Sequence, residues 1–319
     1  MLRVLIGAVV LGALPAAFAQ GTYPSGPISL IIPLAAGDAT DIAGRAIGDA
    51  LARELKVPVI AVNKPGAGGA LGTDAIVKAS KDGHTIGVPN NAALVFREVV
   101  DPSTVNYEAL KDLTPLGLAM RSPSILVVGS KQPFHSFREM VDYGKKNPGK
   151  VRIGTAGIGS VGDFCVQTIN SLTGAGLTMV PYKGAAPAVT DMRGGQIEGV
   201  ILALGAMRPL ISNGTVRGLL ISSKWDDLPD VPTLQEVGYS QPLFGIWTGF
   251  FGPAGLPSEV TNVLVPALER AVRSPEIAAR LKTFGIVADW APPEKMVAEM
   301  REEQQRVREI AKAAGLIQR

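Results

Sequence analysis

The feature that most constrains the fold is a short apolar run, a helical pattern and a second apolar run in direct succession. The apolar runs are residues 28–32 and 59–62, and the helical pattern is residues 40–55. Within residues 40–55 the apolar side chains fall on one face, and the charged side chains lie mostly elsewhere. This order predicts a β–α–β unit in which an amphipathic helix covers a parallel sheet.

The same alternation continues and predicts a doubly wound α/β architecture. Further strand candidates are residues 85–88, 125–128, 151–153, 177–180, 199–202 and 216–221. The last third is predicted to be helical, with one helix starting at Ser274-Pro275-Glu276 and stopping at Gly285, and another over residues 293–314. The chain has 319 residues, and single cores stop growing near roughly 250–300 residues, so two domains are expected.

The N-terminus predicts export. Arg3 precedes an uncharged, mostly apolar run over residues 4–18, which ends in small residues and is too short for the roughly 20 residues of a membrane span. Residues 1–19 are therefore expected to be a signal peptide, cleaved near Ala19, that sends the protein to the periplasm. Cys165 is the only cysteine, so no lipid-anchored cysteine follows the cleavage site and no intramolecular disulfide can form. The mature chain carries a net charge of about +2, which argues against nucleic-acid binding.

Three loops rich in small residues follow predicted strands. Residues 33–41, with the sequence PLAAGDATD, separate the first strand from the first helix, where Thr40 or Asp41 could cap the helix. A helix N-terminus offers unpaired N–H groups and about half a positive charge, which suits a carboxylate. The loop is therefore interpreted as an anion cradle, and an ordinary capped turn is the alternative.

The other two loops lack a nucleotide signature. Residues 63–72, NKPGAGGALG, are not followed by the Lys-Ser/Thr pair of a Walker A motif. Residues 157–162 match GxGxxG, but the acidic residue expected about 20 positions later to hold a ribose is absent. Residues 157–162 are therefore interpreted as another anion loop. Residues 63–72 are either a similar loop or a glycine-rich segment that packs tightly.

Catalytic signatures are sparse. His84, His135 and Cys165 lie far apart in the sequence, and Ser160 lacks the spacing of a Gly-x-Ser-x-Gly elbow. Two histidines and one distant cysteine give no metal-ligand spacing. The sequence therefore predicts no catalytic residue, no metal and no cofactor, with Cys165 a small buried apolar residue.

Several segments together resemble one family. They are GPISLIIPLAAGDATDIAGR, NKPGAGGALG, DGHTIG, NPGKVRIGTAGIGS, VPYKGAAPAVTDMRGGQIEG, LPDVPTLQEVG and FGPAGLP, in this order along the chain. They resemble the tripartite tricarboxylate transporter substrate-binding family, also called the Bug family, over essentially the whole mature chain.

The resemblance implies a type II periplasmic-binding-protein fold, with two doubly wound α/β domains and a ligand cleft between them. Domain one is expected to comprise residues 20–122 and 226–319, and domain two residues 123–225. The domain-one loops implied to hold a carboxylate contain Ala35, Ala36, Gly37, Asp38, Thr40, Asp41, Gly66, Ala67, Gly68, Asn90 and Asn91. The domain-two loops implied to form the opposite wall contain Thr155, Gly159, Ser160, Tyr182, Lys183, Gly184 and Asp191. Asp191 could equally cap a helix or turn, and Lys183 could be a solvated surface charge.

One residue departs from the family pattern. Asp38 stands where the family usually has a second glycine after Gly37, so an acid lies beside a proposed anion site. Either its side chain points to solvent, or it adapts the pocket to a ligand that carries an amine or a hydroxyl.

The function implied is a monomeric receptor that captures a small organic carboxylate and delivers it to membrane transporter subunits. A periplasmic sensor that reports ligand to a signalling partner would use the same clamp, and the sequence does not separate the two. A periplasmic hydrolase is a third hypothesis, disfavoured because no nucleophile and base stand in a recognisable pattern.

Overall fold

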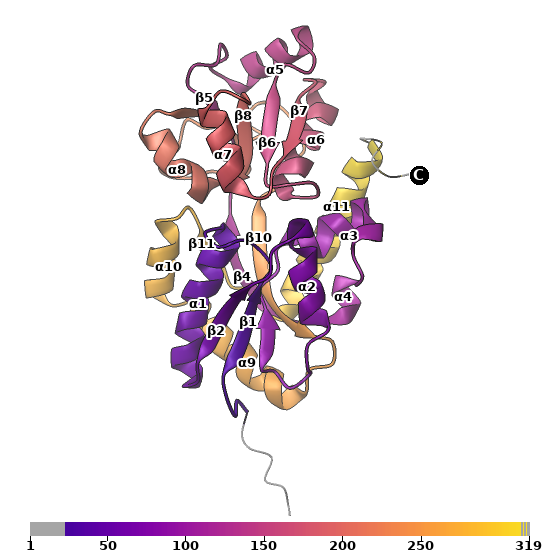
Figure 1. The fold of residues 1–319 in the computed structure, drawn as a ribbon, viewed down its shortest axis with the longest axis vertical. Helices are drawn as coiled ribbons and strands as arrows, with labels where there is room; N and C mark the ends of the chain where they lie inside the picture. Colours follow the sequence, from indigo (N-terminus) through magenta and orange to yellow (C-terminus); the bar gives the residue numbers. More distant parts are fainter. Residues whose placement is uncertain (1–22, 314, 316, 318–319) are drawn as a thin grey trace, which may run out of the picture.

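A computed structural model describes residues 23–313, 315 and 317, so the predicted signal peptide over residues 1–19 lies outside the described residues. Two α/β domains lie one above the other, each built around its own sheet (Figure 1). The predicted architecture of two α/β domains is confirmed.

Domain one is built on a six-stranded mixed sheet with the order β11-β4-β10-β3-β1-β2. The strands are β1 (Ile28–Ile32), β2 (Val59–Asn63), β3 (Thr85–Gly87), β4 (Leu113–Ser122), β10 (Ile246–Pro253) and β11 (Val287–Ala288). Strand β1 pairs in parallel with β2 and β3, whereas β10 runs antiparallel to β3 and β4. The predicted β–α–β unit is confirmed, but β4, β10 and β11 were not predicted.

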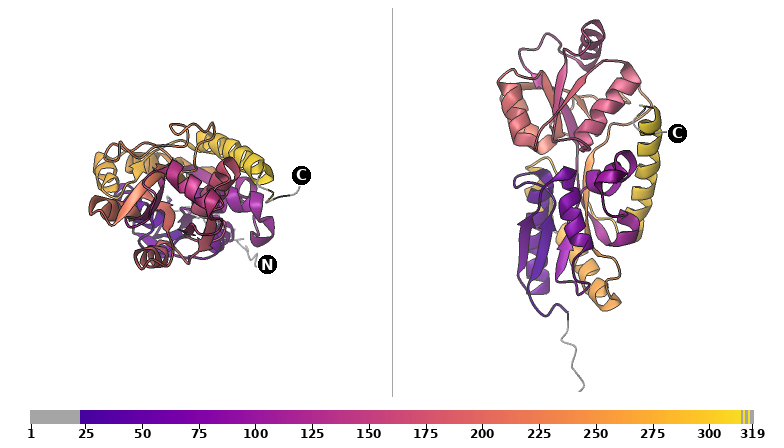
Figure 2. Two further views of the ribbon diagram at one scale, coloured as in Figure 1. Left: turned by 90° about the horizontal axis from the view of Figure 1, so that it is seen from above. Right: turned by 45° about the vertical axis from the view of Figure 1, so that its right-hand side comes forward.

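The helices of domain one cover both faces of its sheet (Figure 2). They are α1 (Ala39–Leu55), α2 (Ala70–Val77), α3 (Arg97–Val100), α4 (Ala109–Asp112), α9 (Ser258–Val272), α10 (Pro275–Lys282) and α11 (Pro293–Ala313). Short helical turns at Ala67–Gly69 (η1), Ala92–Phe96 (η2) and Pro102–Thr104 (η3) complete the domain. Helix α1 buries its apolar face, including Ile47 and Leu51, as its sequence pattern predicted.

Domain two is built on a five-stranded mixed sheet with the order β7-β6-β8-β5-β9. The strands are β5 (Ser124–Gly129), β6 (Arg152–Thr155), β7 (Thr178–Pro181), β8 (Gly199–Ala203) and β9 (Val216–Ile221). The helices are α5 (Phe137–Lys146), α6 (Val161–Thr173), α7 (Ala185–Arg193) and α8 (Leu204–Ser212). Strand β6 is parallel to β7 and β8, and β5 is antiparallel to β8 and β9.

The chain passes between the domains at the ends of long strands. Strand β4 of the first sheet leads through Pro123 directly into β5 of the second, and β9 leads through residues 222–245 back to β10. The strand order therefore matches a domain one built from both ends of the chain and a domain two built from its middle. The domain limits at residues 122 and 226 stay a prediction.

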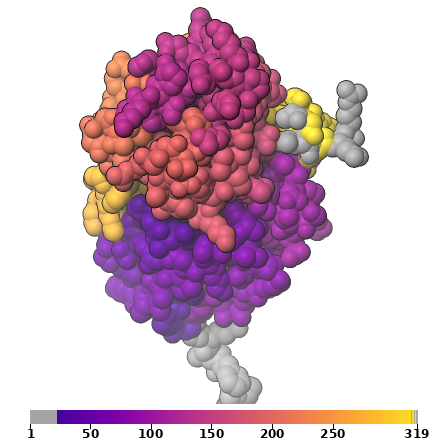
Figure 3. Space-filling model, turned by 45° about the horizontal axis from the view of Figure 1, so that its top comes forward, coloured from indigo at the N-terminus to yellow at the C-terminus, as the bar shows by residue number. Residues whose placement is uncertain are grey.

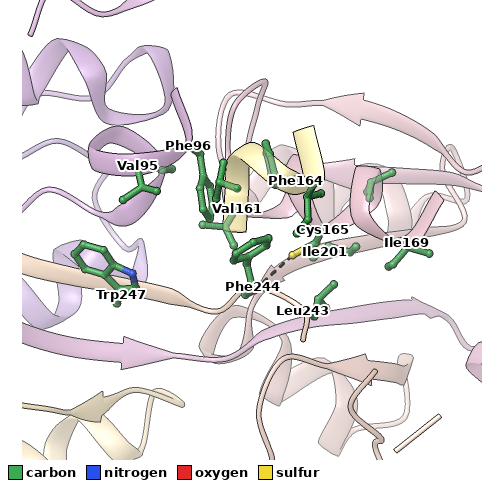
Figure 4. Close-up of a cluster of buried hydrophobic side chains, with 14 of the residues drawn as sticks. Val95, Phe96, Val161, Phe164, Cys165, Ile169, Ile201, Leu243, Phe244 and Trp247 are labelled. Atoms are coloured by element: carbon green, nitrogen blue, oxygen red, sulfur yellow. Dashed lines mark hydrogen bonds between the residues drawn. The ribbon is translucent and has the colours of Figure 1, made fainter. Parts of the chain in front are cut away.

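A buried hydrophobic cluster continues from one domain into the other beside these crossings (Figure 4). Phe96 of η2 stacks on Phe164 of α6 with ring centroids 5.1 Å apart, and Phe244 packs edge-on against Phe96 at the same separation. All three side chains are buried. Burial of apolar area is the main source of stability in such contacts, so the cluster ties the two domains together on this side. Within the described residues, no helix is both long and apolar enough to span a membrane.

Candidate ligand-binding site

A cavity of about 130 Å³ lies between the two domains. Figure 3 shows the magenta-to-red residues of domain two lying directly against the indigo and purple residues of domain one. The lining residues come from both domains and are mostly small or apolar. They are Leu34, Gly37, Asp38, Ala39, Ile42, Gly68, Asn90, Ala92, Ser124, Ala156, Ser160, Val161, Gly162, Ala185, Ile201, Leu202, Ala203, Gly205, Ala206, Ile246 and Phe284.

Four helices begin at the wall of this cavity. Helix α1 contributes Ala39, α6 contributes Val161, α7 contributes Ala185, and α8 contributes Gly205. Each helix N-terminus presents backbone N–H groups and a partial positive charge. Of the described residues that line the cavity, none is Lys, Arg or His, and Asp38 is the only ionisable one. The cavity can therefore attract an anion through backbone dipoles and without a cationic side chain.

The loop between β1 and α1 is held in shape by the Asp41 carboxylate. It accepts hydrogen bonds from the Gly37 N–H at 2.9 Å, from Arg45 Nε at 2.8 Å and from Asn63 Nδ2 at 2.8 Å. Asn63 also donates to the Leu34 carbonyl at 3.0 Å. Asp41 is buried and does not line the cavity, so its observed contacts organise the loop.

Asp38 caps helix α1. Its side chain accepts a hydrogen bond from the Thr40 N–H at 2.9 Å, so Asp38 is the N-cap. The sequence had suggested Thr40 or Asp41 for this role, and that prediction was wrong. Burial raises the pKa of the Asp38 carboxyl, the hydrogen bonds from Thr40 oppose the rise, and the charge of Asp41 adds to it. Asp38 lines the cavity, and burial there disfavours the ionised form of its carboxyl.

The loop before α6 in domain two repeats this design. Ser160 caps the helix by accepting from the Asp163 N–H at 3.3 Å, and Asp163 accepts from the Gly159 N–H at 2.8 Å. Gly37 and Asp41 form the same contact across the same spacing in domain one. The two loops thus present matching helix N-termini to the cavity from opposite domains.

The loop after β2 depends on an unusual backbone. Four successive residues, Gly66, Ala67, Gly68 and Gly69, all have positive φ, between 48° and 139°. Such angles suit glycine and cost energy for a residue with a Cβ. The glycines that the sequence analysis singled out are therefore required by the course of the chain, and one of them, Gly68, lines the cavity.

The structure brings five of the predicted site residues to the cavity wall, namely Gly37, Asp38, Gly68, Asn90 and Ser160. The other predicted residues do not line the cavity. Five of them share loops with lining residues: Ala35, Ala36, Gly66, Ala67 and Gly159. Thr40 and Asp41 follow the lining residue Ala39 in α1, and Tyr182, Lys183 and Gly184 immediately precede the lining residue Ala185. Asp191 accepts a 2.7 Å hydrogen bond from the Tyr182 hydroxyl, Lys183 is exposed, and Thr155 is buried at the end of β6.

Asn91 takes part in a buried network next to the domain crossing. Its amide donates to the Gly245 carbonyl at 3.0 Å and to Glu303 of α11 at 3.2 Å, and Glu303 also accepts from Trp247 Nε1 at 2.6 Å. Burial raises the pKa of Glu303, and its hydrogen bonds from Trp247 and Asn91 oppose the rise. These contacts attach α11 to the start of β10.

Sequence reasoning missed the cavity residues on α8 and on the loop between α10 and β11. Gly205 lies against the backbone of Phe284, so a Cβ at residue 205 would overlap the Phe284 carbonyl oxygen. Nearby, Arg208 of α8 donates to the carbonyls of Lys282 and Thr283, both at 3.0 Å. Glycine and a backbone carbonyl leave no chemical signature, so only the spatial pairing of these elements could reveal the contact.

His84, His135 and Cys165 do not line the cavity. His84 packs edge-on against Tyr23, and His135 is exposed ahead of α5. Cys165 is fully buried, and burial raises the pKa of its thiol to about 12, which confirms its interpretation as a small apolar residue. Among the described residues, no group of three or more His, Cys, Asp or Glu side chains could hold a metal ion.

Comparison with known proteins finds relatives along most of the chain. The sequence pattern of the family described as "Tripartite tricarboxylate transporter family receptor" matches residues 43–316. Protein BugT of Bordetella pertussis is 29% identical over 296 residues, which cover 92% of this chain and 91% of BugT.

Two solved structures are similar over nearly their full length. The R. palustris protein Rpa4515, solved with adipate, is 26% identical with a TM-score of 0.86, and the match covers 92% of this chain and 98% of that one. MatC from Rhodopseudomonas palustris, solved with bound malate, is 28% identical with a TM-score of 0.82, covering 90% of this chain and 99% of that one.

Proposed function

The chain belongs to the tripartite tricarboxylate transporter family of receptors, the Bug family, and from this premise we propose that it is a periplasmic solute-binding protein. Its ligand is a small organic carboxylate, which it captures between its domains and delivers to the membrane subunits of a tripartite tricarboxylate-type transporter. It acts as a monomer, outside the cytoplasmic membrane, after removal of residues 1–19. Its proposed role is to bind the carboxylate and release it chemically unchanged.

The observation that carries this proposal is the convergence of four helix N-termini on one small cavity between the domains. An anion there gains the attraction of several backbone dipoles, and electrostatic interactions are stronger near a protein surface than in bulk solvent. Proteins that share the fold were solved with adipate and malate, both carboxylates, which supports the same ligand class here.

The residues proposed to contact the ligand are those at which the family motifs and the cavity wall coincide: Gly37, Asp38, Gly68, Asn90 and Ser160. The remaining motif residues of the same loops, Ala35, Ala36, Ala67, Gly159 and Gly184, are proposed to lie close enough to assist through backbone N–H groups or ordered water. Apolar side chains, among them Ile42, Ile201 and Ile246, would enclose the carbon skeleton.

A thermal-shift screen tests the proposal. We expect at least one of malate, succinate, adipate, aspartate and benzoate to stabilise the mature protein. A ligand at 100 times its Kd adds about 2.7 kcal/mol. For a chain of this length that corresponds to a rise in melting temperature of about 4 °C. Matched neutral amides of the same acids serve as controls. Stabilisation by the amides as well as the acids, or by none of the compounds, would contradict a carboxylate receptor.

Replacing Asp38 with glycine is expected to shift ligand preference from an amino acid toward its deaminated analogue. The acid borders the cavity, so its removal relieves repulsion of a simple carboxylate and withdraws a partner from an ammonium group. Loss of the helix cap is tolerable, because glycine at this position costs only a few tenths of a kcal/mol, roughly. Calorimetry with succinate and aspartate measures the ratio of their affinities in both proteins. An unchanged ratio would show that the Asp38 carboxylate does not act on the ligand.

A further inference from the structure

Arg97 connects domain one to domain two beside the cavity. The residue begins α3 in domain one and is only 6% exposed. Its Nη2 donates across the domain boundary to the carbonyl oxygen of Ile158 at 2.8 Å, and its Nη1 donates to Thr104 Oγ1 at 2.7 Å within domain one. A side chain anchored in one domain thus holds the backbone of a loop in the other.

Two glycines leave the space that the guanidinium occupies. A Cβ added at Gly68 would lie 2.9 Å from Arg97 Nε, and one added at Gly159 would lie 3.0 Å from the same atom. Both distances are shorter than ordinary van der Waals contact. Gly68 belongs to domain one and Gly159 to domain two, so the guanidinium is enclosed between glycine loops of opposite domains. Gly68 itself and Ser160, the neighbour of Gly159, line the cavity.

The guanidinium is incompletely paired. Its buried Nε–H has no hydrogen-bond partner, and among the described residues no carboxylate oxygen lies within 4.0 Å of its nitrogens. Burial raises the pKa of the Asp163 carboxyl, and the charge of Arg97 lowers it in part. A buried cation without a paired anion is unfavourable, and the cost falls when negative charge is placed nearby.

We propose that Arg97 is a latch that couples domain closure to the presence of an anion in the cavity. This inference rests on the proposed function, because it assigns to Arg97 a role in holding a carboxylate ligand. Closure inserts the guanidinium between the two glycine loops and forms the bond to Ile158. A carboxylate in the adjoining cavity, on the far side of Gly68 and Ser160, supplies the negative charge that the buried cation lacks. Arg97 therefore favours the closed form most when the site holds an anion.

The test compares Arg97→Gln with Arg217→Gln in the mature protein. Arg217 is the matched control because its side chain also donates to a backbone carbonyl, that of Phe134 at 3.0 Å. Arg217 and Phe134 both belong to domain two, so this hydrogen bond does not connect the domains. The probe is whichever of malate, succinate, adipate, aspartate and benzoate stabilises the wild type most. For Arg97→Gln we expect a Kd about tenfold to a hundredfold higher, since a hydrogen bond from a charged group is lost. The increase should appear in the dissociation rate, because closure retains a ligand that has already bound.

Small-angle scattering measures the radius of gyration, which should not change when the replaced residue only stabilises one domain. At saturating probe, Arg97→Gln should keep a larger radius of gyration than the wild type, while Arg217→Gln matches the wild type and both variants keep wild-type circular dichroism. Arg97→Lys should recover part of the affinity through its charge. If the wild type bound none of the probes, the proposed function would fail, and the latch, which needs an anion in the cavity, would fail with it; binding by the wild type with equal affinity and radius for Arg97→Gln would overturn the latch alone.

Discussion

Replacing Gly205 with alanine is expected to hold the two domains apart and to weaken carboxylate binding by about a hundredfold or more. Gly205 lies in domain two, and an added Cβ would overlap the Phe284 carbonyl oxygen of domain one. Both residues line the cavity. The overlapping atom belongs to the backbone of the loop between α10 and β11 and cannot rotate away as the end of a flexible side chain can, so we expect the overlap to be relieved by separating the domains.

The same substitution leaves the helix intact, because alanine has the highest helix propensity of all residues. Reduced binding therefore cannot be attributed to loss of α8. Calorimetry and small-angle scattering with the best ligand of the panel should show a weaker Kd and a larger radius for Gly205→Ala. Gly129→Ala is the matched control, since Gly129 also lies in domain two and no atom lies within 4 Å of a Cβ built there. Wild-type affinity and radius in Gly205→Ala would mean that binding does not require this approach of the domains.

Replacing Gly37 with valine is expected to weaken carboxylate binding by at least about thirtyfold without unfolding the protein. Gly37 has a φ of 82°, a conformation that a β-branched residue rarely adopts. No atom lies within 4 Å of an added Cβ, so the effect comes from the backbone and not from a collision inside the protein. When the backbone changes, the Gly37 N–H leaves the Asp41 carboxylate, and the loop at the cavity wall loses its shape.

Asparagine at the same position separates backbone conformation from side-chain bulk. Asparagine tolerates positive φ better than other residues with a Cβ, so Gly37→Asn should retain much more affinity than Gly37→Val. Calorimetry of both variants with the same carboxylate measures the difference. Equal losses in the two variants would point to obstruction of the cavity, and no loss in either would remove this loop from the binding site.

The first unit of the fold was predictable because each of its signals is local. Residues 28–32 are apolar in a row, and residues 40–55 show a helical apolar face, so strand and helix follow from spacing alone. Strands β4 and β10 were missed because Pro115, Gly117, Gly249 and Gly252 interrupt their patterns. Pairing between these two strands, with two irregularities in register, compensates for the weak local signal.

The candidate site divides in the same way. Gly37, Gly68 and Ser160 could be predicted because they lie in recognisable glycine-rich loops. Positive φ favours glycine at residues 37 and 68, and helix capping favours serine at residue 160. The structural contacts of Asp41 and Asn91 were not predictable, since the sequence does not show that Asn63 and Glu303 lie beside them. The far wall, including Gly205 and Phe284, carries no polar group that a sequence pattern could single out.

The position of β10 in the first sheet also determines the order in which the protein can be completed. Strand β10 lies between β4 and β3, yet it is synthesised after the entire second sheet. Because the N-terminal part of the chain is made first, domain two can assemble from one continuous segment. The earlier part of domain one stays incomplete until then, with an unfilled gap between β3 and β4. The last third of the chain thus completes the domain that was begun first. A chain truncated before residue 246 would retain a finished second domain attached to an open, aggregation-prone sheet edge.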